Sequence, residues 1–289
     1  MARPRKPTAA SDPEKLAEAL KIYDGKKQTA TAEAELEKTV DQLIACGEPA
    51  VPFVIKVMLE KNYPSCLCAA SALAAIGDAS AIPALVDMLE DRDVGSIGRE
   101  ALELFGPSCI PAVIDRIKQR IARPLAKEER KDLTTNFALG LIGDIQCDES
   151  VAFLNGLLDD YISEMPDEPF ETSEYEWKYA CIEFFVLLDA LVKQQDKRAI
   201  PHIRKARDCF PREYTDHIIC RIAIDRIQKG ITDRYLPMDA LEIQMPSGGI
   251  MEALSGEKTG WKKAFKAKYG KYLPDNENDQ EEEDDSLMP

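Results

Sequence analysis

The chain has 289 residues, of which 45% are hydrophobic and 7% aromatic, and its formal net charge is −15. An acidic surface repels phosphate groups, because binding of nucleic acid and of anionic lipid relies on lysine and arginine. No apolar run is long enough to span a bilayer, and the basic N-terminus lacks the apolar stretch of a secretory signal. We therefore expect a cytoplasmic protein with no transmembrane segment and no DNA binding through its body.

Charge and apolar patterning divide the chain into four regions. Residues 1–12 are basic and we expect them to be disordered, whereas residues 13–230 carry a sustained helical pattern. Residues 231–273 form an irregular C-terminal extension that ends in a short basic-aromatic helix. Residues 274–289 carry eight acids and no base, so we expect a disordered acidic tail.

Apolar periodicity over the helical region predicts twelve helices. Leu, Ala, Ile, Glu, Asp and Lys dominate the composition, which favours helix over strand. The expected ranges are 13–23, 32–46, 50–61, 65–76, 80–90, 95–105, 108–121, 127–142, 148–163, 174–194, 197–208 and 212–229.

A short motif recurs along these helices, in which an apolar pair precedes a proline. Apolar residues follow two, three and six places later, as on one helix face. A glycine lies shortly before each copy, where it can end one helix before the proline starts the next. The prolines are Pro52, Pro83, Pro111 and Pro201, and the glycines are Gly47, Gly77, Gly106 and Gly143. We expect Asp78, which follows Gly77, to cap a helix.

Two copies of the motif are degenerate. The copy at Ser150-Val151-Ala152 lacks the proline and has a polar Asn155 on its apolar face. The copy after Pro201 has Arg204 where the first three copies have an aliphatic residue. Such departures are expected at the end of a repeat array, because terminal repeats are atypical.

The stretch LAAIGDASAIPALVDMLEDRD at residues 73–93, with the helical pattern that follows it, resembles the HEAT-like repeats of the phycobilisome-lyase type. The resemblance is strong over residues 43–118 and fades toward both ends. It implies an all-α fold, a right-handed α-solenoid in which helix pairs stack because one pair cannot cover its own apolar side. Repeats of this type occur in binding scaffolds, chromophore lyases, adaptor subunits and a metal-dependent hydroxylase, so the resemblance leaves the function open.

Few residues suggest catalysis or metal binding. The eight cysteines are scattered through apolar segments, and we expect reduced thiols. His202, Cys209, His217 and Cys220 could be drawn as a zinc site, but the short couplets typical of zinc sites are missing. We interpret both histidines as ordinary, partly exposed residues. We expect no cofactor, no metal and no catalytic residue, since nucleotide-binding and hydrolase motifs are also absent.

An acidic insertion interrupts the repeats at residues 160–177. It is interpreted either as a solvated loop or as a docking lobe for a basic partner, because insertions in repeat proteins often lie on the binding face. The candidate partner-binding residues here are Asp159, Asp160, Glu164, Asp167, Glu168, Glu171 and Trp177.

The basic-aromatic segment GWKKAFKAKYGKYLP covers residues 260–274. Its aromatic residues recur at four-residue spacing and share one helix face. The segment either caps the open end of the solenoid or contacts an acidic protein, RNA or anionic lipid. Its candidate binding residues are Trp261, Lys262, Lys263, Phe265 and Lys266.

A row of polar residues is expected where the proline-started helices lie side by side. Eight places after the corner proline stand Glu60 and Asp91, so this row is mainly acidic. We interpret the protein as a non-catalytic scaffold or adaptor that binds a basic or polar protein through its concave face and acidic insertion. The alternative is a lyase-type enzyme or accessory subunit that holds a small molecule or chromophore in the groove. The oligomeric state is left open.

Overall fold

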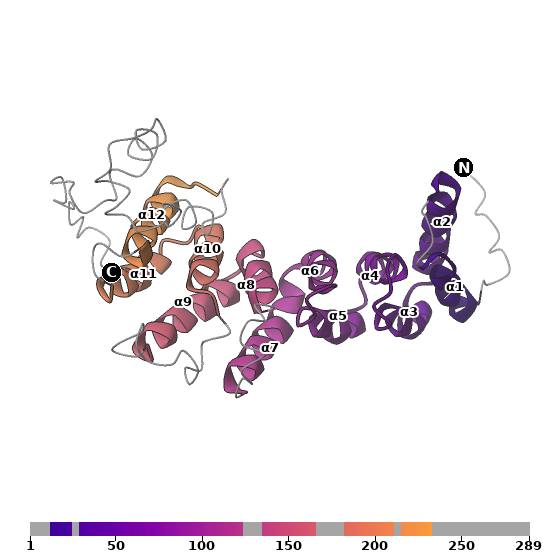
Figure 1. Ribbon diagram of the computed structural model, residues 1–289, viewed down its shortest axis with the longest axis horizontal. Coiled ribbons are helices and arrows are strands. Elements are labelled where there is room, and N and C mark those ends of the chain that lie inside the picture. The colour runs from indigo at the N-terminus through magenta and orange to yellow at the C-terminus, as the bar shows by residue number, and fades with distance from the viewer. Residues whose placement is uncertain (1–11, 25–28, 124–134, 166–181, 211–214, 233–289) are drawn as a thin grey trace, which may run out of the picture. The chain divides into compact units, whose positions relative to one another are not determined.

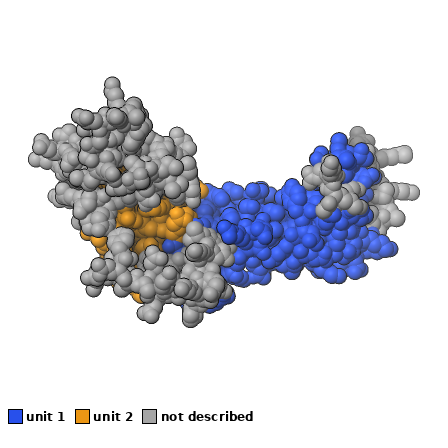
Figure 2. All heavy atoms as spheres, in the orientation of Figure 1, with its two compact units in different colours: residues 1–150, 173–182 blue, residues 151–172, 183–289 orange. Residues whose placement is uncertain are grey.

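The computed structural model describes residues 12–24, 29–123, 135–165, 182–210 and 215–232, and these residues form helices without any strand. Two compact units are present, residues 1–150 with 173–182 (unit 1) and residues 151–172 with 183–289 (unit 2) (Figure 2). The all-α fold predicted from the sequence is confirmed, and each predicted helix has a counterpart in the described residues. The right-handed twist and the limits of the four predicted regions stay predictions.

Unit 1 contains eight α-helices within the described residues (Figure 1). Four short 3₁₀ turns lie before or after them, at Lys21–Tyr23, Glu48–Ala50, Ala79–Ala81 and Gly106–Cys109. The helices are α1 (Pro13–Leu20), α2 (Ala30–Cys46), α3 (Val51–Met58), α4 (Ser65–Ile76), α5 (Ile82–Met88), α6 (Gly95–Glu103), α7 (Ile110–Ala122) and α8 (Thr135–Asp144).

Unit 2 is built from the remaining helices of the described residues. They are α9 (Asp148–Ser163), whose first three residues belong to unit 1, α10 (Phe184–Gln194), α11 (Ala199–Asp208) and α12 (Thr215–Lys229). Helix α12 packs against both α10 and α11. Tyr161 of α9 stacks on Phe184 of α10 at a centroid distance of 5.5 Å, so aromatic rings join α9 to this group.

The helices of unit 1 pack as sequence-adjacent pairs, α1 with α2, α3 with α4, α5 with α6, and α7 with α8 (Figure 1). The first helix of every pair has a proline in its first turn, where no amide donor is needed. We call α1, α3, α5 and α7 the proline row and α2, α4, α6 and α8 the second row. Neighbouring pairs contact along both rows, so each pair covers the apolar side of the next.

The corner between α4 and α5 shows why the chain changes direction there. Gly77 ends α4 in the left-handed conformation, with φ of 72°, which is easy only without a side chain. Asp78 then accepts a hydrogen bond from the Ser80 amide at 2.8 Å, which caps the following 3₁₀ turn. The predicted capping role of Asp78 is confirmed. Gly143 differs from the other predicted corner glycines, because it lies inside α8.

The core of unit 1 consists of the apolar face that the repeat predicts. Leu85 and Val113, two places after their prolines, are fully buried. Alanines fill the side of α4 that faces its neighbours, and Ala69, Ala70 and Ala72 are all at most 1% exposed. Small side chains allow the short helices to approach closely, so burial of many aliphatic groups stabilises the stack.

Candidate binding surfaces

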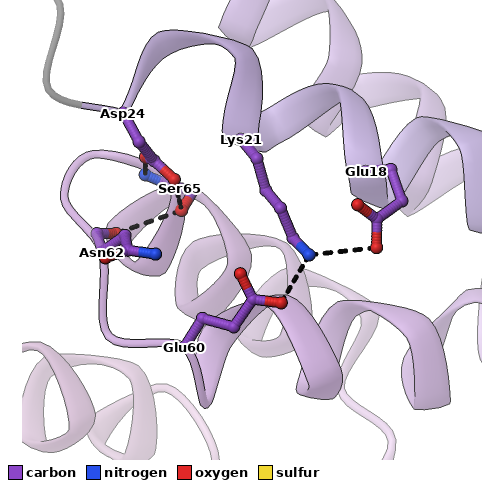
Figure 3. A network of polar contacts seen from close by, with 6 residues as sticks. All are labelled: Glu18, Lys21, Asp24, Glu60, Asn62 and Ser65. Atoms are coloured by element: carbon purple, nitrogen blue, oxygen red, sulfur yellow. Dashed lines mark hydrogen bonds and ion pairs between the residues drawn. The ribbon is translucent and has the colours of Figure 1, made fainter.

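A network of polar contacts fastens the first helix pair of unit 1 to the second (Figure 3). Lys21, just after α1, donates to Glu18 at 3.0 Å and to Glu60 at the end of α3. Its bond to Glu60, and then that to Glu18, raises the pKa of Lys21 above its usual value. Asp24 accepts from the backbone amide and the hydroxyl of Ser65, at 3.0 and 2.8 Å. The predicted partner-binding residue Glu60 is therefore already held by a lysine of the same chain.

Asp91, the other predicted member of the acidic row, lies between α5 and α6 in a similar position. It accepts from Lys61 at 2.5 Å and from the amides of Asp93 and Val94 at 2.9 and 3.2 Å. The Lys61 bond, followed in smaller part by these amides, lowers the pKa of Asp91. The acidic row thus links successive repeats. Its contact with a basic partner stays a prediction.

Two arginines join later helices of unit 1 in the same manner. Arg116 of α7 donates to Asp87 of α5 and pairs with Glu90 at 3.2 Å. In the second row, Arg99 of α6 pairs with Asp144 at the end of α8. Charged groups at the rim of each helix contact therefore fix the register between repeats, while aliphatic groups supply the core.

Three large apolar side chains lie in the chain segments that carry the polar network of Figure 3, and all three are exposed to solvent. They are Ile22 (56% exposed), Leu59 (47%) and Tyr63 (60%). Ile22 lies between Lys21 and Asp24 in the chain, and the other two belong to the α3–α4 corner. We call these three residues the corner patch. Sequence reasoning missed it, although Leu59 occupies the position where the next repeat has a charged Glu90.

A shallow hollow of about 490 Å³ lies along α1 and reaches the corner patch at Ile22. Its lining is mainly charged, and one lining carboxylate, that of Glu14, makes no ion pair with any described residue. The lining residues are Asp12, Glu14, Lys15, Glu18, Ala19 and Ile22. An acidic hollow of this kind can accept a lysine or arginine side chain.

Helix α2 also presents carboxylates to solvent. Only Leu36 and Leu43 of its 17 residues are buried, as expected for a helix with neighbours on one side. Its exposed acids include Glu33, Glu37 and Asp41, and none of these pairs with a described base. They give the first helix pair a polar outer face, which terminal repeats need for solubility.

In unit 2, the predicted residue Asp159 forms a cluster with two residues of α11. The carboxylate is 2.8 Å from Nδ1 of His202 and accepts from Lys205 at 3.3 Å. Because a carboxylate only accepts, Nδ1 of His202 carries the proton in this bond. The cluster joins α9 to α11 in the way that Arg116 joins α5 to α7. Asp160 and Glu164, also predicted, are exposed near the end of α9.

The polar defect of the repeat, Asn155, is buried on α9. Its side chain is 8% exposed, and its Oδ1 accepts no hydrogen bond from any described residue. The equivalent residues of unit 1 are Val86 and Ile114, which are buried, and Ile55, which is half-buried. A buried carbonyl oxygen without a donor destabilises a fold by about 1 to 3 kcal/mol. Asn155 is therefore a weak point in the packing of unit 2.

Three of the four residues considered for a zinc site have separate partners, and the fourth, Cys220, is buried. His217 donates from Nδ1 toward the backbone oxygens of Arg207 and Phe210, at 3.1 and 3.2 Å, near the end of α11. It is buried, contrary to the expectation of partial exposure, and burial lowers its pKa. Cys209 contacts the Lys205 oxygen. Across the described residues, no three His, Cys, Asp or Glu side chains gather as a metal site.

The cysteines of the described residues are free thiols. Burial raises the pKa of Cys66 and of Cys109 to about 11, so both are protonated at neutral pH. A protonated, buried thiol is a poor nucleophile, and these two residues serve the core.

Several predicted binding residues lie outside the described residues. They belong to the acidic insertion and to the basic-aromatic segment, and their contacts with a partner stay predictions. They are Asp167, Glu168, Glu171, Trp177, Trp261, Lys262, Lys263, Phe265 and Lys266.

The two units differ in charge over their described residues. Unit 1 has 21 acidic and 11 basic residues, a net charge of −10, whereas unit 2 has nine of each. In unit 2, α11 contributes Arg204, Lys205 and Arg207. Among the described residues, the excess of acid therefore lies in unit 1.

Residues 69–91, which form most of α4, the Gly77 corner and α5, match the family model of the PBS lyase HEAT-like repeat. The match covers the helix, glycine and proline-started helix that the sequence motif predicts, within a stack of helix pairs. The chain contains a HEAT-like repeat. No curated protein and no solved structure matches it. Among the described residues, no helix is both long and apolar enough to cross a membrane.

Proposed function

We propose that this HEAT-like repeat protein is a non-catalytic scaffold or adaptor that binds a basic protein partner. The observation that carries the proposal is the net charge of −10 on the described part of unit 1, spread along stacked helix pairs. Complementary charge accelerates encounter and selects the partner's sign. The concave face and the acidic insertion at residues 160–177 belong to the proposed binding region.

The acids of unit 1 divide into two sets with different roles. Glu60, Asp91 and Asp87 pair with bases of neighbouring repeats and hold the stack together. Glu33 and Asp41 of α2 are exposed to solvent and pair with no described base. The second set gives an electrostatic attraction that weakens with salt, because exposed charges are screened within about 10 Å at 0.1 M.

The test is a pull-down from native lysate with the full chain as bait, at low and at high salt. We expect a specific protein partner with a basic surface, retained at low salt and released at high salt. Copurification of a small molecule or chromophore without a protein partner would contradict the scaffold and favour the lyase-type alternative. Retention of acidic proteins would contradict the proposed partner chemistry.

A further inference from the structure

We infer that the corner patch and the hollow beside it form a docking site for a protein segment that carries both bulky apolar and basic side chains. The inference rests on the proposed function and assigns it a place and a recognition chemistry. The site joins Ile22, at the end of α1, with Leu59 and Tyr63 of the α3–α4 corner.

The apolar centre of the site is not explained by packing of the repeat. In the next corner, between α5 and α6, Leu89 and Val94 are 1% and 5% exposed, so the same kind of turn buries its apolar residues. The exposed positions of that corner hold Glu90 and Asp93, which are polar and solvated. The α3–α4 corner has Leu59 at the position of the exposed Glu90 and Tyr63 at the position of the buried Val94, and both of its apolar side chains are exposed. An apolar cluster with a polar rim is typical of an interface.

The polar network of Figure 3 holds this patch in place. Lys21 connects the α1 end to Glu60, and Asp24 fixes the start of α4 through Ser65. Three segments of the chain are therefore locked to one another beneath the exposed side chains. A rigid patch loses little entropy on binding, so its contacts contribute fully to affinity.

The charge around the patch selects a basic occupant. Among the described residues, the rim contains six acids and three bases, a net charge of −3, and these bases are held in ion pairs with the acids. The rim residues are Asp12, Glu14, Lys15, Glu18, Lys21, Asp24, Glu60, Lys61 and Asp91. A lysine or arginine of the partner would enter the hollow near Glu14, while a neighbouring leucine or aromatic residue covers the patch.

The experiment measures binding of a labelled synthetic peptide to the full chain by fluorescence anisotropy. The probe is an amphipathic lysine-leucine peptide, and the comparison probe replaces every leucine with serine at the same charge. The test variant is Leu59→Ser with Tyr63→Ser. The matched control is Leu104→Ser, because Leu104 is 75% exposed in unit 1 and lies outside the patch. All three side chains are exposed, so we expect unchanged far-UV circular dichroism.

We expect the lysine-leucine peptide to bind the test variant at least about tenfold more weakly than the natural chain, as for interface anchors. The control variant should bind like the natural chain, and the lysine-serine peptide should bind weakly to all three. Equal binding by the test and control variants would overturn the docking site and leave the proposed function standing. No binding of either basic peptide to the natural chain would overturn the proposed function as well.

Sedimentation measurements distinguish two possible occupants of the patch, a segment of another protein and a second copy of this chain. We expect the natural chain and the Leu59→Ser, Tyr63→Ser variant to have the same mass in solution. A self-associated natural chain that becomes monomeric in the variant would assign the patch to a second copy, and would overturn docking of a foreign segment.

Discussion

The same position of the repeat is filled differently in the two units. Three places after the corner proline, unit 1 buries the aliphatic Val86 and Ile114, whereas the copy on α9 in unit 2 buries Asn155 without a described partner for its Oδ1. On the same helix, Asp159 bonds to His202 of α11. The comparison shows that the same repeat position is filled by a buried aliphatic group in unit 1 and by a buried amide in unit 2.

The charges follow the same division. The described residues carry a net charge of −10 in unit 1 and of zero in unit 2, where Arg204 of α11 is exposed. Unit 1 combines regular aliphatic packing with an acidic exterior, and this favours it as the part that attracts a basic partner. Three paired substitutions test the comparison.

The largest changes in the free energy of unfolding should come from exchanging Val86 and Asn155, which occupy the same position of the repeat in the two units. Val86→Asn should lower the free energy of unfolding by about 3 to 5 kcal/mol, because it loses apolar burial and leaves an amide without partners. Asn155→Val should raise it by about 1 to 2 kcal/mol, since it removes a buried unpaired oxygen. Urea denaturation followed by far-UV circular dichroism measures both. A destabilised Asn155→Val variant would show that Asn155 has a partner.

Replacing two glycines inside helices by alanine should change the stability of the fold in opposite directions. In unit 1, a Cβ on Gly98 of α6 would lie 2.8 Å from the Met88 Cβ and 3.0 Å from the Leu85 oxygen. Gly98→Ala should destabilise by about 1 to 3 kcal/mol through overpacking. In unit 2, a Cβ on Gly156 of α9 would meet no described neighbour within 4 Å, so Gly156→Ala should stabilise by about 0.5 to 1 kcal/mol. Thermal and urea unfolding measure both stability changes. If both variants were stabilised, or both destabilised, the difference in packing around Gly98 and Gly156 would be contradicted.

Replacing two aspartates should give the smallest changes in the free energy of unfolding, and these changes should depend on pH in opposite ways. The Lys61 bond lowers the pKa of Asp91 below its ordinary 3.8, so its stabilisation is present above pH 3.8 and is lost as the pH falls through the folded pKa. Burial raises the pKa of Asp216 above 3.8, so its stabilising effect is present below pH 3.8 and is lost as the pH rises through the folded pKa.

The variants Asp91→Asn and Asp216→Asn test this pair. At neutral pH, Asp91→Asn should lose up to about 1 kcal/mol relative to the natural chain, as for exposed ion pairs, and the difference should shrink in acid. Asp216→Asn should gain stability relative to the natural chain as the pH rises above 3.8. Unfolding free energies measured at acidic and neutral pH check both directions, and parallel curves for the two variants would contradict the assignment.

Much of the fold could be predicted because its signals are local. Apolar periodicity, glycines such as Gly77 and prolines such as Pro83 specify where helices begin and end. Helices α4 and α9 match their predicted ranges of 65–76 and 148–163. The burial of His217 was not predictable in this way, because it depends on how α12 packs against α11.

The candidate site was harder to predict, because the sequence shows which residues are charged but not which residues form ion pairs with them. Glu60 and Asp91 were singled out as members of one row, yet their lysines, Lys21 and Lys61, lie 39 and 30 residues away in the chain. The corner patch depends on exposure, and nothing in the local sequence distinguishes an exposed Leu59 from a buried Leu89.

The sequence by itself determined the helices, their proline-started repeat and the excess of acid, because each depends on neighbours along the chain or on composition. Only the tertiary structure decided which charges are neutralised within the stack and which remain exposed. It also decided that Ile22, Leu59 and Tyr63, which neighbour residues of one polar network in the chain, are exposed to solvent. The physical reason is that pairing and exposure depend on contacts between repeats, which join residues far apart in the chain.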